Sequence, residues 1–490
     1  QDYNEAVVPG VVAYEWQFSP MIGGHNFNRL VGITYPMKLQ DQTRMALTLN
    51  YGNNAGDTHS VLSRITNITS STVGPLASYG YMGTSRRVST SLGCGTMQTV
   101  DSNLDLGFAG LDRFGRLTDL HHKLGATTLH RFEYTYDVMG NRTSAKVTQR
   151  PFNGQQHVND RSSVYEYDGL HRLTNWTMGQ LNSEGTIDPY GTGSAPYPRS
   201  IDWRLDTLGN WSADPEGSEI RTQDFFTSDP GPETLYRTHV VNQANQVTEK
   251  LARFDSNPTM GPDGAFTYDA NGNTVFDGQY YLQYDAWNRL VQVNAIGSAA
   301  VGTDGHLSGG TLGALVCRYT YDGLGRLIRK ETPVSQGLTA LQAKDLYYDG
   351  VRRIQETIAR PPIINQNSSM MNPEADPTGG AGTFQLEGIV ENDEQPLEKI
   401  VEVGEAEPVQ TIVEPQMLIG GGPGGGTERW TDRQYVYGPE YVDEFICQID
   451  RNDDVWYMLQ DANYNVVAIL TDTGSVVTQY TYEPYGLLVA

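Results

Sequence analysis

The chain has 490 residues, which exceeds the usual size of a single compact core and predicts either several domains or an extended repeat architecture. Its 58 acidic and 34 basic residues give a formal net charge of -24, and so negative a surface repels phosphate backbones and anionic lipid headgroups, which disfavours nucleic-acid binding. Cys94, Cys317 and Cys447 lie far apart without a C-x-x-C spacing, which excludes a zinc knuckle and a dense disulfide framework and leaves room for one bridge at most.

No apolar run approaches the roughly 20 residues that cross a bilayer, so no membrane span is expected. The first residues, Gln1–Ala6, lack a basic segment followed by an apolar one, so this numbering contains no signal peptide. Because the chain starts with Gln and ends within a repeat, we expect it to be a processed or partial product of a longer protein.

Residues 1–105 hold several runs rich in β-branched and aromatic residues, which are typical of strands. These runs are Val11–Phe18, Leu30–Tyr35, Met45–Tyr51, Ser78–Met82 and Arg86–Ser91. Tyr51–Ile65 has the order of a repeat unit with a lengthened turn. We therefore predict an N-terminal β-strand region continuous with the repeat sheet that follows; an independent N-terminal β domain is the alternative.

Residues 106–360 repeat one unit: an aromatic-x-Tyr-Asp strand, a turn of mostly small or polar residues, and a second strand of β-branched residues. Two copies follow one another in Phe266–Val293. The alternation flanking Asn271 and Gly272 is a strong hairpin signal and predicts a two-residue type I′ turn, in which both central residues have positive φ. Successive strand residues face opposite sides, which gives each hairpin an aromatic face.

The Tyr-Asp pair recurs along this region as the signature of the repeat. Its copies are Tyr136-Asp137, Tyr167-Asp168, Tyr268-Asp269, Tyr284-Asp285, Tyr321-Asp322 and Tyr348-Asp349, with turn glycines at Gly140, Gly272 and Gly325. Degenerate copies lie at Gly110–Leu117, Trp203–Asn210 and Asn242–Val247. Almost nothing has a period of 3.6 residues, so we predict one wide, twisted sheet and a single short helix around Leu338–Ala343.

Residues 361–430 change in composition to Asn, Ser, Pro, Gly and acidic residues. Such a segment has little aromatic surface to bury and much backbone freedom to lose, so we predict a flexible acidic and Gly-rich insertion. Leu397–Val403 and Val409–Glu414 could still add edge strands. Residues 431–490 then resume the repeat.

Taken together, Tyr321-Asp-Gly-Leu-Gly-Arg-Leu327 and Tyr284-Asp-Ala-Trp-Asn-Arg-Leu290 resemble the YD repeat of the Rhs family, which includes bacterial polymorphic toxins, toxin-complex cocoon subunits, wall-associated proteins and the related teneurins. The resemblance covers most of the chain outside the insertion. It implies an all-β fold: a long curved ribbon of antiparallel YD-repeat β-hairpins spiralling into a shell or open barrel. Residues 431–490 resemble the repeats that lead towards the core segment of this family, whose self-cleaving Asp-Pro-x-Gly-Leu element does not occur in this sequence.

The sequence contains only weak matches to motifs of catalytic or ligand-binding sites. Asp-Pro-x-Gly strings at Asp188–Gly191, Asp214–Gly217 and Asp376–Gly379 lack the following Leu and suit type I turns. The run Gly420–Gly426 lacks the Lys-Ser/Thr of a phosphate loop, and we interpret it as linker. We therefore expect no cofactor and no enzymatic activity.

Two further patterns resemble part of a metal-binding site, but neither has all the features that such a site needs. Asp450, Asn452, Asp454 and Asp461 have the spacing of a calcium loop, but a valine stands where the sharp turn needs glycine, so we predict a solvated acidic hairpin. The pair His121-His122 has no carboxylate or cysteine at ligand spacing. We interpret it as two exposed turn histidines.

The tyrosines at equivalent positions of adjacent hairpins are expected to stack or pack edge-on, which suits a scaffold. Repetition without a catalytic cluster, together with the family resemblance, predicts a non-enzymatic, secreted or cell-surface shell that encloses or displays another polypeptide. The expected partners are an enclosed C-terminal polypeptide or neighbouring copies in a surface assembly. The alternative is an adhesion module that binds glycans or a neighbouring cell surface. A hydrolase assembled across distant repeats is a third class, which no motif indicates.

Overall fold

The structure is a computed structural model, and the residues that it describes cover most of the chain. The described ranges are 15–18, 29–52, 56–100, 110–150, 161–187, 199–210, 220–224, 233–254, 257–302, 305–334, 341–360 and 428–488. By its contacts the chain divides into two units, residues 1–360 with 429–490 and residues 361–428. The edge strands considered at Leu397–Val403 and Val409–Glu414 lie outside the described residues, and so do the three Asp-Pro-x-Gly strings and the glycine run.

The described part is almost entirely antiparallel β-structure, in two sheets, which confirms the predicted fold class. The first sheet contains β1 (Glu15–Phe18), β2 (Leu30–Thr34), β3 (Ala46–Asn50), β4 (Asn67–Ser70), β5 (Gly74–Met82), β6 (Arg86–Leu92), β7 (Thr96–Thr99), β8 (Asp119–Leu124), β9 (Thr127–Tyr136), β10 (Arg142–Gln149), β11 (Ser162–Tyr167), β12 (Leu173–Gly179), β13 (Arg199–Asp202), β14 (Ile220–Asp224), β15 (Glu233–Val241), β16 (Val247–Phe254) and β17 (Asn257–Ala265). The second contains β18 (Thr267–Tyr268), β19 (Thr274–Phe276), β20 (Tyr280–Tyr284), β21 (Leu290–Ala295), β22 (Leu315–Tyr321), β23 (Leu327–Pro333), β24 (Leu341–Asp349), β25 (Arg352–Arg360), β26 (Glu428–Tyr437), β27 (Phe445–Asp450), β28 (Val455–Gln460), β29 (Val466–Leu470) and β30 (Val476–Gln479).

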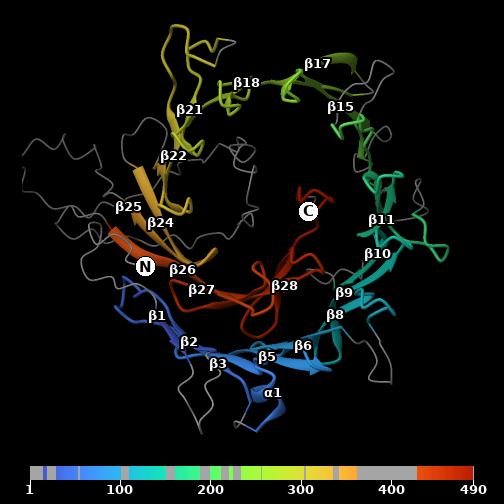
Figure 1. The fold of residues 1–490 in the computed structure, drawn as a ribbon, viewed down its shortest axis with the longest axis vertical. Helices are drawn as coiled ribbons and strands as arrows, with labels where there is room; N and C mark the ends of the chain where they lie inside the picture. Colours follow the sequence, from blue (N-terminus) through green and yellow to red (C-terminus); the bar gives the residue numbers. More distant parts are fainter. Residues whose placement is uncertain are drawn as a thin grey trace, which may run out of the picture. The chain divides into compact units, whose positions relative to one another are not determined.

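Within each sheet the strands pair in chain order, each antiparallel to the next, and we call this succession of hairpins the ribbon. Its path from β1 to β30 can be followed by colour (Figure 1). Pairing of β7 with β8 and of β8 with β9 joins the described strands of the first hundred residues to the repeats that follow. Because every strand is followed by a turn back, alternate turns lie on the same edge of the ribbon.

The prediction of a single sheet is wrong, because the ribbon divides into two sheets between β17 and β18. Only Phe266 separates these two strands, and its backbone N–H still donates to the carbonyl of Thr248, 2.9 Å away. β17 contains Pro258 and Pro262, which have no N–H to donate to a neighbouring strand. The pairing of β17 with β16 shifts register beside Pro262 and continues to Ala265, so the two sheets divide at Phe266, within the repeats themselves.

The helix predicted around Leu338–Ala343 is also wrong, since Leu341 begins β24 and the residues before it lie outside the described ranges. The described helix, α1 (Thr58–Val61), lies instead in the lengthened turn of the Tyr51–Ile65 unit. Asp57 caps it, because its carboxylate accepts the backbone N–H of His59.

The main hydrophobic core lies between early strands of the ribbon and its last strands. Leu76 of β5 is buried in one cluster with Ile446 of β27 and Leu459 of β28. Figure 1 shows β27 and β28 beside β3, β5 and β6. The hydroxyl of Tyr35 crosses between the sheets and donates to the carbonyl of Tyr435 at 2.7 Å. Residues far apart in sequence therefore form a two-layered region here.

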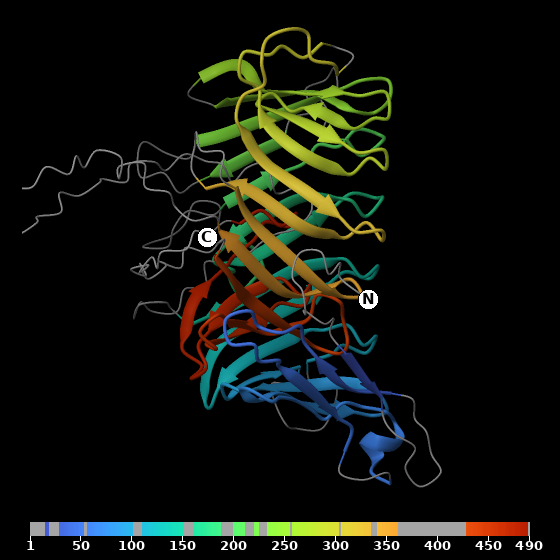
Figure 2. The same ribbon diagram turned by 90° about the vertical axis from the view of Figure 1, so that its left-hand side faces the viewer.

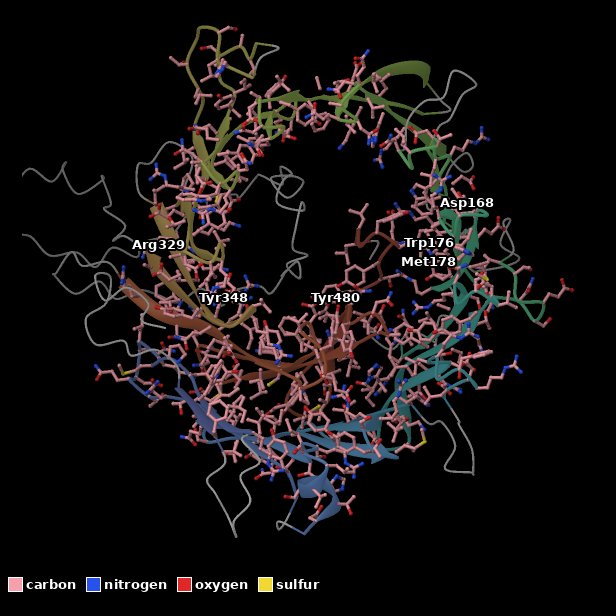
Figure 3. The ribbon with its side chains drawn as sticks, viewed as in Figure 1. Asp168, Trp176, Met178, Arg329, Tyr348 and Tyr480 are labelled. Atoms are coloured by element: carbon pink, nitrogen blue, oxygen red, sulfur yellow. The ribbon has the colours of Figure 1, made fainter. Side chains whose placement is uncertain are left out.

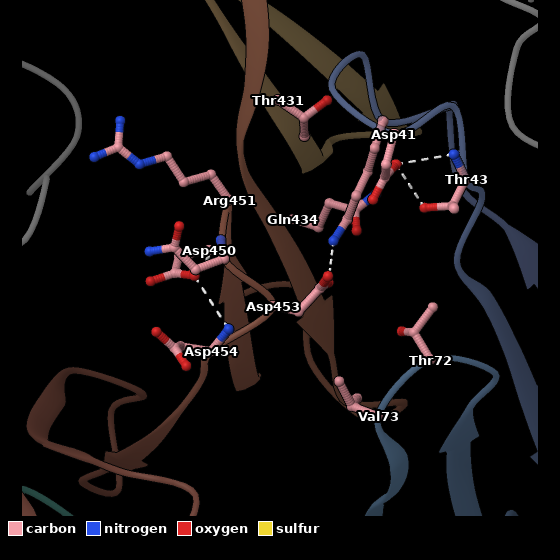
Figure 4. Close-up of polar contacts among 12 residues, drawn as sticks. Asp41, Thr43, Thr72, Val73, Thr431, Gln434, Asp450, Arg451, Asp453 and Asp454 are labelled. Atoms are coloured by element: carbon pink, nitrogen blue, oxygen red, sulfur yellow. Dashed lines mark hydrogen bonds and ion pairs between the residues drawn. The ribbon is translucent and has the colours of Figure 1, made fainter. Parts of the chain in front are cut away.

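Ion pairs join the same two layers. Lys38, whose side chain is almost fully buried, pairs with Asp453 in the turn between β27 and β28 (Figure 4). Arg87 of β6 pairs with Glu444 and, at 3.2 Å, with Glu440. Only Arg87 and Glu444 are buried on both sides, so removing one of these two would leave an uncompensated buried charge, at a cost of about 3 to 5 kcal/mol.

The middle of the ribbon is a single layer. A second, smaller core cluster consists of Trp176, Met178, Ile201 and Trp203 on and after β12 and β13 (Figure 3). None of the described residues from 206 to 346 belongs to either core cluster.

Candidate functional site

The unit at Tyr268 shows how the repeat turn is built. The N–H of Asp269 donates to the carbonyl of Asn273, and the N–H of Gly272 donates to the carbonyl of Asp269, both at 3.0 Å. Gly272 has a φ of 89°, whereas Asn271 does not have a positive φ. The predicted type I′ turn is therefore wrong: the connection is a three-residue turn that ends in a left-handed glycine.

The aspartate side chain explains this geometry. One carboxylate oxygen of Asp269 accepts the N–H of Asn271 at 2.9 Å and the N–H of Asn273 at 2.8 Å. Holding both donors requires the intervening residues to curl around the carboxylate, as in an Asx-turn. The Asp of the Tyr-Asp signature is thus the centre of the turn.

The same turn recurs at the other signature units except the last one before the insertion. Asp137, Asp168, Asp285 and Asp322 each accept two turn N–H groups at 2.8 to 3.0 Å. Donation from the backbone of Arg172 lowers the pKa of Asp168 below its ordinary value. Gly140 and Gly325 have positive φ, like Gly272. At Asp349 the connection is shorter, because Asp349 pairs directly with Arg352 across Gly350 and Val351.

Arginine at the fifth position of the turn links one unit to the next. Arg289 donates from Nε to Asp285 at 2.7 Å and from Nη1 to the carbonyl of Asp322 at 3.1 Å. Its guanidinium carbon lies 5.0 Å from the ring centroid of Tyr321. Arg116 makes the corresponding contacts with the Tyr136 unit and Arg326 with the Tyr348 unit. An arginine thus occupies the place at which we expected a second tyrosine ring.

Asparagine at the same position makes a different link. Asn273 donates to Asp269 at 2.9 Å and to the side chain of Asn288 in the next turn at 2.9 Å. Asn288 takes the left-handed position that glycine holds elsewhere, with a φ of 60°. The pairs Asn141–His171 and Asn210–Asn245 repeat this arrangement. Within these units, a turn with asparagine at the fifth position is followed by a turn with a side chain at the left-handed position, because asparagine is short and leaves room for it. A turn with arginine at the fifth position is followed by a turn with glycine there.

The signature tyrosines are engaged by their hydroxyl groups. Five of the six donate to a backbone carbonyl of the preceding unit at 2.6 to 3.0 Å; the pairs are Tyr136–Leu117, Tyr167–Arg142, Tyr268–Val247, Tyr284–Thr274 and Tyr321–Leu290. Tyr348 is buried (Figure 3). The structure therefore brings the signature residues into a row along one edge of the ribbon, not into a common pocket.

The single-layer stretch has two chemically different faces. Strand alternation and pairing place Leu282, Val293, Cys317 and Tyr319 on one face. On the other, Arg329 forms an ion pair with Asp345 at 2.6 Å (Figure 3), and Gln283, Gln292, Arg318 and Glu331 follow one another across the strands. One face is mainly apolar and aromatic across β20 to β22 and continues into Lys330 and Lys344 of β23 and β24, and the other is a polar ladder.

The histidine pair is not exposed, so that prediction is wrong. His121 and His122 are buried in β8, and His122 lies opposite His130 of β9. Nε2 of His122 lies 3.0 Å from the carbonyl of Gln460, which β28 brings from the other end of the chain. Burial lowers the pKa of His122 to about 4 and that of His130 to about 3, so all of these rings are neutral at pH 7.

The acidic pattern at Asp450 is the turn of the β27–β28 hairpin. Asp450 accepts the N–H groups of Asn452 and Asp454, and the latter contact is drawn in Figure 4. Asp461 belongs to a different turn, in which it accepts from Asn463 and Asn465. In the described ranges no three His, Cys, Asp or Glu side chains gather where they could hold a metal ion. All three cysteines are buried free thiols.

Sequence reasoning missed the linking role of the fifth turn position. Its signal was present in the repeated spacing between Asp and Arg or Asn, for example Asp285 to Arg289 and Asp137 to Asn141.

The described part contains no helix that is long and apolar enough to cross a membrane.

No protein-family model and no curated protein matches the chain. Solved structures that it resembles include the Photorhabdus luminescens Tc holotoxin pore with a mutation in TccC3, at a TM-score of 0.46 and 12% identity over 94% of this chain. They also include a crystal structure of TcdB2-TccC3, at a TM-score of 0.43 and 12% identity over 97% of this chain. The chain spans 17% and 20% of the length of these two chains.

Proposed function

We propose that this chain is a non-enzymatic, Rhs-like YD-repeat segment of a structural shell that encloses or displays another polypeptide at the cell surface or outside the cell. The observation that carries the proposal is the single-layer stretch of the ribbon. Strand pairing places Leu282, Val293 and Tyr319 on one face of this stretch, and none of these residues belongs to a described core cluster. Leu282 and Val293 are buried, whereas Tyr319 is partly exposed. A sheet whose two faces differ in this way suits a wall that contacts another polypeptide on one side.

The chemistry of that face suits an unfolded or partly folded polypeptide. Tyr319, which is partly exposed on β22, combines an aromatic ring with a hydroxyl group, a combination that suits contact with apolar side chains and backbone groups alike. The opposite face is tied together by polar pairs such as Arg329 with Asp345. The asymmetry gives the ribbon an inner and an outer side.

The hydrogen bonds of the turn side chains favour a structural role over a catalytic one. The carboxylates of the signature aspartates accept turn N–H groups, and the arginines beside them bond to the next unit. Side chains held in this way stabilise the ribbon, because each link couples two neighbouring hairpins.

The proposal can be tested with a photo-cross-linker placed at Tyr319 or at Thr320, which are neighbours on opposite faces of β22. A natively unfolded test polypeptide is joined after Ala490. We expect adducts with the test polypeptide from position 319 and none from position 320. Equal adducts from both positions, or none from either, would overturn the proposal.

The adhesion alternative depends on tyrosines that are free to meet a glycan. The hydroxyls of Tyr268, Tyr284 and Tyr321 donate to carbonyls of the chain itself, and Arg289 lies over the ring of Tyr321. A glycan array separates the two functions. Selective binding that disappears when exposed tyrosines are replaced would favour adhesion.

A further inference from the structure

A row of large apolar side chains protrudes from the turns of the ribbon. Each stands two residues after the central Asp of its turn: Phe114, Met139, Leu170, Leu208, Trp287 and Leu324. Between 68% and 77% of each side chain is exposed to solvent. We call these six residues the turn tips.

Contacts between turns show that the turn tips are neighbours. Arg116 bonds to the carbonyl of Asp137, Asn141 to His171, and Arg172 to the carbonyl of Asp206. The tips from Phe114 to Leu208 therefore belong to four consecutive turns on one edge, where the hairpin turns are stacked in Figure 2. Since two strands separate consecutive turns, the tips recur about every 10 Å.

The turn itself does not require an apolar tip. Ala244 and Asn271 hold the equivalent position in two intervening units, and their turns have the same hydrogen bonds. The backbone N–H at the tip position donates to the central Asp or Asn whatever the side chain there is, and a large apolar side chain in water lowers solubility. Their presence in four consecutive turns is therefore better explained by a surface that becomes covered.

Two of the four turns carry an ion pair beside the tip: Asp112 pairs with Arg116 and Asp168 with Arg172, each at 2.6 Å. In the other two turns Asp137 and Asp206 accept from Asn141 and Asn210. The net charge of -24 opposes contact between two copies of this chain, so the apolar tips must outweigh a repulsion that salt screens.

We propose that the turn tips form a contact between two copies of this chain, packed edge to edge about a two-fold axis. A second copy presents the same repeat of about 10 Å, so all four tips can fit between those of the partner at once. At on the order of 100 Å² per tip, four tips from each copy bury on the order of 800 Å². This is the size of a weak, reversible interface, and it is independent of what the apolar face of the ribbon binds.

Analytical ultracentrifugation of the full chain at low and high salt tests this contact. We expect a concentration-dependent dimer that strengthens with salt, because screening weakens the repulsion between two acidic chains. Replacing Phe114, Met139, Leu170 and Leu208 together by Ser should weaken the dimer at least tenfold. The control is Ala244→Ser with Asn271→Ser, which changes the equivalent position in two turns that lack an apolar tip. This control should leave the dimer intact. Circular dichroism checks that both variants keep their strands.

Three results would overturn the proposal. The first is a chain that stays monomeric at every concentration and salt condition. The second is a dimer that the four serines do not weaken. The third is a monomer whose tips bind zwitterionic lipid vesicles, which would assign the row to a membrane surface.

Discussion

The guanidinium of Arg289 lies over the ring of Tyr321, 5.0 Å from its centroid, and joins two hairpins through this contact and a hydrogen bond to Asp322. The same arginine bonds to Asp285 in its own turn. One side chain thus fixes a turn, the following tyrosine and the spacing between them. The hydrogen bond to a carbonyl of the next unit recurs at Arg116, Arg172 and Arg326, and it explains why the Asp-to-Arg spacing is repeated while strand lengths vary.

Replacing Arg289 by Lys should weaken two hairpins at once. An ammonium cannot bond to Asp285 and Asp322 in the fixed geometry of a guanidinium, and it stacks less well on Tyr321. We expect a loss of about 1 to 2 kcal/mol in the free energy of unfolding. Urea denaturation measures it. Arg318→Lys, on the same sheet but in an exposed position, is the control and should change stability by less than about 0.5 kcal/mol; equal losses in both variants would contradict the linking role.

The turn at Asp322 offers a matched pair of glycines. Gly325 has a φ of 83°, Gly323 does not have a positive φ, and open space surrounds the position of a Cβ at each. Gly325→Ala should therefore cost about 1 kcal/mol, since only the backbone conformation is strained. Gly323→Ala should be neutral or stabilising by up to about 1 kcal/mol, because it restricts the unfolded chain. Thermal unfolding of the two variants compares them directly, and an equal effect would mean that the turn is not the one described.

Local features of the ribbon could be predicted from the sequence because they depend on neighbouring residues. Alternation located β3, β5 and β6, and the Tyr-Asp pair located the turns. The turn type was wrong because the Asn271-Gly272 pair was given more weight than Asp269. The carboxylate of Asp269 satisfies two N–H groups of the turn, and this favours the longer connection.

Features that depend on distant contacts could not be predicted. His122 looked like a surface residue because the group that covers it, the carbonyl of Gln460, lies 338 residues away in sequence. The core between Leu76 and Ile446 arises in the same way. The row of turn tips was present in the repeat, but only the structure shows that these side chains are exposed on consecutive turns.

The buried histidines predict a loss of stability in acid. In the folded chain burial lowers the pKa of His122 from 6.5 to about 4. The unfolded chain therefore binds more protons between these values, and stability falls as pH decreases from about 6.5 to about 4. The loss from one such histidine is on the order of 3 kcal/mol.

Urea denaturation at pH 7, 5.5 and 4.5 tests this prediction with wild type and His122→Gln. Glutamine does not titrate and can still donate to the carbonyl of Gln460. The carboxylates titrate equally in both proteins, so the difference between their slopes reports the histidine. We expect a shallower slope for His122→Gln, and parallel slopes would show that His122 does not stay neutral in the folded chain.

The central claim is that the chain is a ribbon of Asp-centred hairpins, each supported by its neighbours. Hydrogen exchange of Gly272→Val tests it most directly. Gly272 has a φ of 89°, and a Cβ there would lie 3.4 Å from the side-chain nitrogen of Gln246, so valine should cost more than about 1 kcal/mol. Protection should fall in the Asp269 hairpin and next in the hairpins that the contacts of Tyr268 with Val247 and of Asn273 with Asn288 join to it, while β3 to β6 keep theirs. Unchanged protection around Asp269, or an equal loss from β3 to β30, would contradict the account.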